Sequence, residues 1–325
     1  MTLMAPVWDI DPVFFQLPFF QLSIRYYGLI FAFVFLGGFF LFRRQTLRAG
    51  ASENLAFDII IPGFIGLVIG ARLGHVFFYN FNLFLNEPLR LFKVWEGGLS
   101  SHGAAIGLFC ALLWYARKHR LPLLIVTDRF TFSAALGASF VRLGNFFNSE
   151  IVGKVTDSAW GVKFPRYDLL EPSICPARYP SQLVEFAMGL VIFVVLLATD
   201  KILGKEKRPR GVLSALFLIL YFFGRFLVEF IKERQNPEDD HLLSIGQMLS
   251  IPAIAAGLIL LWRCLRKNNL RDGNLRSGNL RGSTSNSSDI DSRDLKKSNP
   301  KKVAPSTKPA ISNPKKGKKK ARSAT

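Results

Sequence analysis

Cysteine is scarce in this chain, and the few that occur are far apart. Cys110, Cys175 and Cys264 form no C-x-x-C pair. Neither a disulfide framework nor a cysteine-based metal site is therefore indicated. No acidic cluster accompanies the polar motifs described below, so we expect no metal ion.

The N-terminus lacks the pattern of a cleavable signal peptide. Residues 1–20 have no basic n-region and no small-residue cleavage site, and they carry Asp9, Asp11, Pro12 and Pro18. Signal peptides need both of the missing features. We expect instead an amphipathic arm that lies at a membrane surface before the first span.

Apolar sequence is what the chain has in abundance. Hydrophobic residues make up 50% of it, and phenylalanine alone occupies 31 positions. Several apolar runs approach the roughly 20 residues that a transmembrane helix needs. The sequence predicts an all-α integral membrane protein with about seven transmembrane helices. The predicted spans are residues 24–42, 58–79, 99–116, 128–148, 180–199, 211–231 and 243–262.

The net charge of +19 is unevenly spread. From Arg263 onward the chain carries 18 lysines and arginines against 4 aspartates and glutamates, so this tail supplies +14 of the total. Beside membrane spans, such a tail marks the cytoplasmic side more simply than it marks a nucleic-acid partner, and we expect no nucleic acid. Basic residues also follow spans one, three and five. The positive-inside rule then predicts a multi-pass membrane protein with its N-terminus outside and its C-terminus in the cytoplasm.

Composition also predicts the domain organisation. Residues 1–267 form the membrane-embedded domain, whereas residues 268–325 cannot bury a core and are predicted to be a disordered basic tail. On the outer side, residues 80–97 mix Phe and Leu with charges, as an interfacial arm does. Residues 149–179, with short β-like pieces near Trp160, are longer than a plain connector and predict a small periplasmic head.

Three arginines lie inside the apolar spans at one depth. Arg72, Arg142 and Arg225 each stand fourteen residues after the inner edge of a span, which is about 21 Å at the helical rise. An arginine at mid-membrane costs about 2.5–3.5 kcal/mol on insertion scales, so each is a candidate for function. Three guanidinium groups at one level predict an anion site, and phosphate fits their fork geometry. The alternative is that Arg142 and Asn145 only bridge helices.

Other polar residues gather at the outer ends of the spans. Tyr221, Arg225 and Glu229 follow at i, i+4 and i+8 on one stripe of span six, although an internal Arg225–Glu229 pair is the alternative reading. His102 stands in the small-residue entry to span three, where a purely structural role is its alternative. Glu185 lies one turn into span five. Transporters usually bind solutes at the midplane, so this asymmetry favours an enzyme that acts on a lipid head group at the outer leaflet.

Four short motifs stand at the outer ends of the spans. They are G-G-L-S-S-H-G at 97–103, R-L-G-N-F-F-N-S-E-I-V-G at 142–153, Y-P-S-Q-L at 179–183 and Y-x-x-x-R-x-x-x-E at 221–229. In this order they resemble the motifs of the bacterial prolipoprotein diacylglyceryl transferase family. The chain departs from the usual family pattern at Val141 and Ala104, where the family commonly has glycine. The resemblance covers roughly residues 10–265 and leaves the tail unexplained.

The resemblance implies a reaction. A diacylglyceryl group passes from phosphatidylglycerol to the lipobox cysteine of a prolipoprotein signal peptide, which forms a thioether and releases glycerol phosphate without a cofactor. Arg142 and Arg225 would hold the phosphate and stabilise its charge as it leaves, and His102 or Tyr221 would take the thiol proton. The resemblance also places four residues in the binding site for the lipid: Tyr27, Asn145, Glu150 and Glu229.

Two rival functions are still open on the residues alone. One is a seven-helix transporter of an anionic solute, and the other is an enzyme that cleaves a lipid phosphate with water. Neither predicts all four motifs. Acyl transfer to the cysteine is disfavoured, because the sequence shows no Ser–His–Asp or Cys–His nucleophile arrangement.

Overall fold

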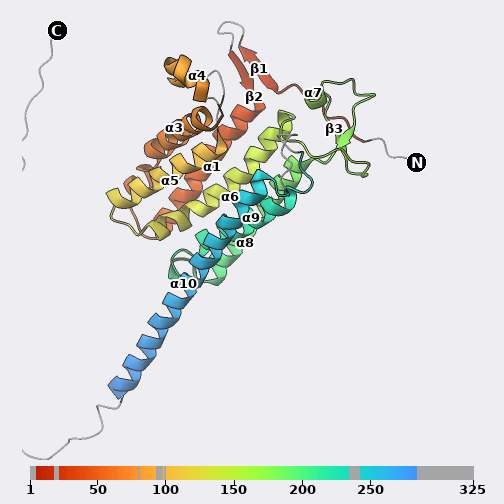
Figure 1. The fold of residues 1–325 in the computed structure, drawn as a ribbon. Coiled ribbons are helices and arrows are strands. Elements are labelled where there is room, and N and C mark those ends of the chain that lie inside the picture. The colour runs from red at the N-terminus through yellow and green to blue at the C-terminus, as the bar shows by residue number, and fades with distance from the viewer. Residues whose placement is uncertain are drawn as a thin grey trace, which may run out of the picture. The chain divides into compact units, whose positions relative to one another are not determined.

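Long helices dominate the computed structural model of the chain, which describes residues 5–17, 22–79, 81–92, 98, 100–233 and 242–283 (Figure 1). Residues 1–275 form one compact unit. The long helices are α1 (Tyr26–Arg48), α3 (Ile60–Tyr79), α5 (Ser101–Lys118), α6 (Leu123–Phe147), α8 (Ser181–Ile202), α9 (Val212–Val228) and α10 (Ile245–Ser283).

Each long helix overlaps one of the predicted spans. Within the described part of the chain, five helical segments are long and apolar enough to cross a membrane, and α9 is a shorter apolar helix. α5 is not among those five. The all-α, multi-pass membrane fold is therefore confirmed, while the count of seven crossings stays a prediction.

The N-terminal arm is a hairpin that reaches the head. β1 (Val13–Leu17) pairs antiparallel with β2 (Leu22–Arg25), directly before α1. Upstream of it, the backbone N–H of Trp8 donates to the carbonyl of Lys163 at 2.9 Å, and the indole of Trp8 donates to the carbonyl of Phe146 at 2.9 Å. The arm thus ties the end of α6 to the head. Its placement at a membrane surface stays a prediction.

Short elements fill the connections. The segment between α6 and α8 holds β3 (Val162–Lys163), α7 (Pro165–Asp168) and β4 (Ala177–Arg178), and β3 pairs with β4. Of the predicted interfacial arm, α4 (Phe81–Asn86) and η2 (Pro88–Phe92) are described, whereas residues 80 and 93–97 lie outside the described residues. The remaining short helices are α2 (Glu53–Phe57) and η4 (Lys205–Lys207).

Glycines allow two of the helices to approach closely. α3 packs along α5 and α1 along α6, while α6, α8 and α9 all pack against one another (Figure 1). In the α3–α5 contact, a Cβ atom built on Gly74 would lie only 2.6 Å from the Cα atom of Gly103. Small residues at such contacts let membrane helices pack through their backbones. Because Gly103 follows His102, this contact holds the first turn of α5, and with it His102, against α3.

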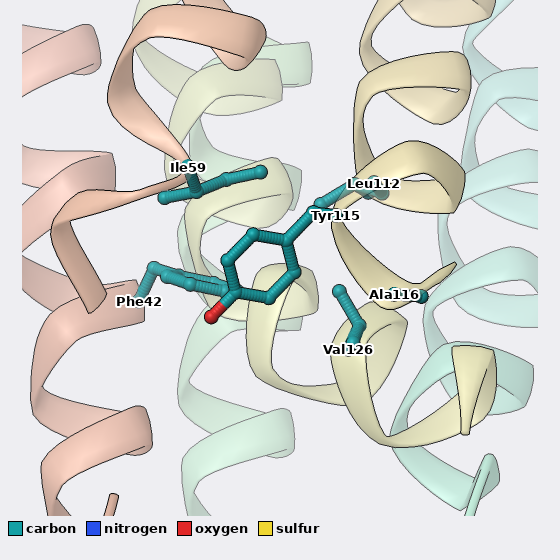
Figure 2. Packing of buried hydrophobic residues seen from close by; sticks show 6 residues of the cluster. All are labelled: Phe42, Ile59, Leu112, Tyr115, Ala116 and Val126. Carbon is teal, nitrogen blue, oxygen red and sulfur yellow. The ribbon is translucent and has the colours of Figure 1, made fainter. Parts of the chain in front are cut away.

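Figure 2 shows the apolar core at the other end of these helices. Tyr115 of α5 is fully buried there, and its hydroxyl donates to the carbonyl of Leu55 at 2.8 Å. A buried tyrosine needs such a partner for its hydroxyl. The cluster joins α1, α5 and α6 to the start of α3, and its members are Phe42, Ile59, Leu112, Tyr115, Ala116 and Val126.

Asp128 fixes the relative height of α6 and α9. Its carboxylate accepts from the backbone N–H groups of Gly211 at 2.7 Å and Ser214 at 2.9 Å, and so caps the start of α9. The N–H groups at a helix start have no partner within the helix, and a carboxylate satisfies them well. Since Arg142 and Arg225 each stand fourteen residues further on, this cap brings the two arginines to the same level.

The C-terminal helix is longer than the sequence predicted. α10 runs to Ser283, although the last span was expected to end at 262 and the tail to be disordered from 268. Nothing in the apolar pattern after 262 indicates a helix, which is why the pattern ended the span there. Residues 284–325 lie outside the described residues, and disorder there stays a prediction.

Candidate active site

The signature segment contains a strained turn at the end of α6. Ser149 and Ile151 have φ angles of +54° and +57°, in the left-handed region that side chains rarely adopt. Two side chains from the first turn of α8 hold this turn. Ser181 Oγ donates to the carbonyl of Ile151 at 2.9 Å, and Gln182 Nε2 donates to that of Glu150 at 2.7 Å. The Y-P-S-Q motif therefore serves the geometry of the signature segment.

Asn145 and Glu150 are joined by hydrogen bonds within that segment. Asn145 is buried, accepts from a terminal nitrogen of Arg142 at 3.4 Å and donates to Glu150 Oε2 at 3.4 Å. The other oxygen of Glu150 accepts from Asn148 Nδ2 at 3.2 Å. Two amides thus orient a carboxylate that is itself exposed. The structure brings Arg142, Asn145 and Glu150 together.

A buried carboxylate from α8 lies between two cations. Arg142 forms an ion pair through Nε with Glu185, and Lys232 Nζ lies 2.8 Å from the other oxygen of Glu185. The exposed fractions of the Arg142, Glu185 and Lys232 side chains are 15%, 5% and 5%. Burial lowers the pKa of the Lys232 amine, while Glu185 acts against that change. Removal of Glu185 would leave two buried cations without their partner, which is strongly destabilising.

Lys232 also connects this cluster to the head. It lies four residues past the end of α9, where its backbone forms a β-bridge with Gly153. The neighbouring Glu233 accepts from Arg178 at 3.1 Å, and Arg178 makes a second ion pair with Asp168 at 2.7 Å. The head and the charged cluster are therefore held by the same short segment after α9.

Two tyrosines lie beside Arg142. Tyr221 on α9 lies close enough to Arg142 to interact with it electrostatically, and it stacks on Phe217, with ring centroids 5.4 Å apart. The ring of Tyr27 on α1 packs on Gly144, where a Cβ atom would lie 2.8 Å from the ring. Gly144 in the signature segment therefore permits the approach of Tyr27, and both tyrosines named from the sequence lie at the site.

The guanidinium group of Arg225 forms no ion pair with the described residues. Among the described residues, no carboxylate lies within ion-pair distance of it, although it lies in the electric field of Glu185. His102 of α5 is exposed and interacts electrostatically with Arg225. Ser100 caps this helix by accepting from the N–H of Gly103 at 3.3 Å. Residues 97 and 99 of the same motif lie outside the described residues.

Glu229 faces Lys232 more closely than it faces Arg225. Its Oε2 atom lies 3.9 Å from Lys232 Nζ, and its carboxyl group packs on Gly246 of α10. The internal Arg225–Glu229 pair, which the stripe on span six left as an alternative, is not formed by these described side chains. The stripe instead places a second carboxylate beside Lys232.

Arg72 is used differently from the other two arginines. Its guanidinium donates to the carbonyls of Leu91 at 3.0 Å and Gly98 at 3.2 Å. These bonds hold the segment that precedes α5. The equal spacing predicted one site for three arginines, but spacing along a helix fixes height and does not fix the direction in which a side chain points.

Sequence reasoning missed Lys232 and the role of Glu185. Lys232 was not singled out from the sequence, and Glu185 was noted only as a polar residue near the outer end of a span. One signal was available, because Lys232 follows Arg225 by seven residues and Glu229 by three, which is the spacing of one helical face.

The comparisons with known proteins agree on one family. A family model described as prolipoprotein diacylglyceryl transferase matches residues 12–263. The phosphatidylglycerol–prolipoprotein diacylglyceryl transferase of Aeromonas salmonicida is 38% identical over 267 residues, which cover 81% of this chain and 93% of the relative. The proteins of the same name from Vibrio cholerae and Vibrio vulnificus are 42% and 41% identical, over 78% and 79% of this chain and 91% and 92% of theirs. The resemblance seen in the four motifs is confirmed.

The cluster around Glu185 leads to a prediction about stability. Glu185→Gln should lower the free energy of unfolding by about 3–5 kcal/mol, because Arg142 and Lys232 lose their buried partner. Adding Lys232→Gln should recover part of that loss, since one of the orphaned charges is then gone. Chemical denaturation of the purified single and double variants measures both effects.

The exposed pair between Arg166 and Asp9 serves as the control. Asp9→Asn should cost at most about 1 kcal/mol, as exposed ion pairs do. Strictly additive effects of the two cluster substitutions would contradict the pairing of Glu185 with Lys232.

Proposed function

Because the chain belongs to the prolipoprotein diacylglyceryl transferase family, we propose that it transfers the diacylglyceryl group of phosphatidylglycerol to the cysteine thiol of a prolipoprotein. The observation that carries this proposal is the arrangement of two arginines. Glu185 orients Arg142, while Arg225 stands at the same level with no carboxylate partner among the described residues. Such a pair suits a phosphate that arrives with the substrate.

The charges of the site match a phosphodiester. Two of the three carboxylates at the site, Glu185 and Glu229, lie against Arg142 and Lys232, and the third, Glu150, is exposed to solvent. Arg225 is the cation without a paired carboxylate among the described residues, and a phosphatidylglycerol head group carries one negative charge. Arginine is suited to this role, because its planar fork binds two phosphate oxygens at once.

The reaction is a displacement at carbon. The cysteine thiol gives its proton to a base, because the thiolate is the nucleophile. A carbon–sulfur bond then forms at the glycerol carbon, the bond from that carbon to the phosphate oxygen breaks, and glycerol phosphate leaves with the bonding electrons. Arg142 and Arg225 stabilise the charge that grows on the leaving phosphate.

Two residues compete for the role of base. His102 lies exposed near Arg225, and an exposed imidazole can receive the thiol proton and pass it on. Tyr221 lies beside Arg142 and interacts with it electrostatically, which suits a role in holding the phosphate. We assign His102 as the base and Tyr221 as a partner of Arg142. Tyr27, Asn145, Glu150 and Glu229 complete the surroundings of the lipid head group.

The site faces the outer leaflet of the bacterial inner membrane in this proposal. Basic residues gather at the C-terminal ends of α1, α5 and α8, opposite to the site, and the positive-inside rule assigns those ends to the cytoplasm. The N-terminus and the head then lie outside. Both substrates reach the site from that side, the lipid from the leaflet and the lipobox cysteine from a signal peptide held in the membrane.

The orientation can be tested by cysteine labelling. In a chain without its native cysteines, Ala159→Cys in the head should react with a membrane-impermeant thiol reagent in intact spheroplasts. Lys207→Cys, which is exposed in the connection between α8 and α9, should react only after the membrane is permeabilised. Labelling of position 207 in intact spheroplasts would reverse the orientation.

The kind of bond formed at the peptide cysteine, a thioether or a thioester, distinguishes diacylglyceryl transfer from the alternative functions. The purified chain, given phosphatidylglycerol and a prolipoprotein peptide, should add the glyceryl backbone with both acyl chains to the peptide cysteine. The product should survive neutral hydroxylamine, which cleaves thioesters but not thioethers. Mass spectrometry of the peptide measures both. A gain of one acyl chain, or release of lipid by hydroxylamine, would rule out displacement at carbon, and no gain at all would favour the transporter or the lipid phosphatase.

Arg225→Lys tests the role of the uncommitted guanidinium. The variant keeps the positive charge but loses the planar fork, so kcat/KM should fall at least about 100-fold, the scale of losing one charge-stabilising donor. The transfer assay measures the loss, and membrane insertion should be unchanged. Arg166→Lys in the head is the control and should stay within about twofold of the parent chain. Near-normal turnover of Arg225→Lys would give Arg225 a structural role only.

A further inference from the structure

A second group of arginines lies at the opposite end of the bundle. Arg48 ends α1, Arg129 stands in the second turn of α6, and Arg208 precedes α9. The three are close enough to interact electrostatically. Arg129 and Arg208 are only 7% and 8% exposed. Arg142 lies thirteen residues further along α6, about 20 Å away, so this group is separate from the active site.

The carboxylates around this group already have partners. Asp200 accepts from Arg48 at 2.5 Å and from Arg208 at 2.6 Å. Glu206 pairs with Arg48 at 2.9 Å. Asp128 is occupied by the start of α9 and lies 3.9 Å from Arg208. Each carboxylate is therefore committed to Arg48, to Arg208 or to a helix end.

Arg129 has no ion-pair partner of its own among the described residues, although it interacts electrostatically with Glu206. None of the ion pairs among the described residues includes it, and its buried Nε atom has no hydrogen-bond partner there. The Nε atom of Arg208 is in the same condition. A buried charge without a partner costs several kcal/mol, and arginine cannot lose its proton to escape that cost. Arg208 is paired with Asp200 through a terminal nitrogen, so Arg129 is the guanidinium group that an added anion would pair, with the free Nε atom of Arg208 as a second donor.

We propose that Arg129, with Arg208 and the edge of Arg48, binds one phosphate-type oxyanion. The guanidinium geometry selects phosphate, because two forks can share the oxygens of one tetrahedral anion. The anion would join α1, α6 and the connection between α8 and α9, and so stabilise the packing at this end. Its source is either the head group of an anionic lipid in the adjoining leaflet or free inorganic phosphate.

Binding is tested on the full chain with Arg129→Met, which keeps much of the apolar stem and removes the charge. The matched control is Arg117→Met, because Arg117 is an exposed arginine at the same end, in the last turn of α5. One arm titrates inorganic phosphate into the detergent-solubilised protein at constant ionic strength. The other arm compares nanodiscs of phosphatidylcholine with and without phosphatidic acid. The unfolding temperature is the readout in both arms.

The parent chain and Arg117→Met should be stabilised equally, and Arg129→Met should need at least about tenfold more of the anion, a loss of about 1.4 kcal/mol. Without the anion, Arg129→Met should be at least as stable as the parent chain, because no unpaired charge is buried. A response in the phosphate arm identifies a soluble ligand, and a response in the lipid arm alone identifies a head group.

Several results would overturn the site. They are an equal response of Arg129→Met and Arg117→Met in both arms, no response of the parent chain in either arm, or a clear loss of stability of Arg129→Met without the anion. Phosphate bound at the active site contributes equally to all these variants and cancels in the comparison. If Arg129→Met does not fold, Arg129→Lys replaces it. That variant keeps a cation and should bind the anion more weakly than the parent chain.

Discussion

Glu185 is the carboxylate on which the charged end of the bundle depends. It accepts Arg142 from α6 and Lys232 from the segment after α9, and all three side chains are withdrawn from water. A carboxylate placed there without two cations would not stay charged, and two cations placed there without it would not stay buried. The three groups are therefore one unit. Because Lys232 also pairs with Gly153, the unit fixes the head as well as the site.

Contacts between the helices hold the side chains of the site in position. Asp128 sets the height of α9 against α6 by capping its first turn. Close approach at Gly74 and Gly103 sets the first turn of α5 against α3. Ser181 and Gln182 hold the strained turn of the signature segment from α8. Catalytic groups gain from this arrangement, since stabilisation of a developing charge requires donors that are already in place.

The sequence predicted heights and segments better than it predicted directions. The interval of fourteen residues gave the level of Arg142 and Arg225, because the rise of a helix is fixed and Asp128 keeps two helices in register. The same interval said nothing about the side-chain direction of Arg72, which turns to the carbonyls of Leu91 and Gly98. Direction depends on neighbouring helices, and their packing is not written in one segment.

Contacts between segments that are distant in the chain could not be predicted from the sequence either. Lys232 was not a candidate from the sequence, because only the fold shows that a carboxylate from α8 lies beside it. The pairing of the chain near Trp8 with Lys163 joins residues more than 150 positions apart, and no local pattern indicates it. The motifs located the signature segment, the α8 entry and the α9 stripe correctly, because each is continuous in sequence and lies on one helix or at its end.

The arginines near the two ends of α6 show how an arginine without an ion-pair partner points to a bound anion. Arg142 has a carboxylate of its own, so its burial is explained within the protein and its position is fixed before any ligand arrives. Arg225 and Arg129 lack such a partner among the described residues, although carboxylates stand nearby and are taken by other cations. Because the nearby carboxylates are paired with other cations, the negative charge that balances such an arginine has to come from outside the chain. At one end the proposed chemistry supplies it as the phosphate of the lipid substrate. The same physical requirement at the other end calls for a second anion, which the reaction does not provide.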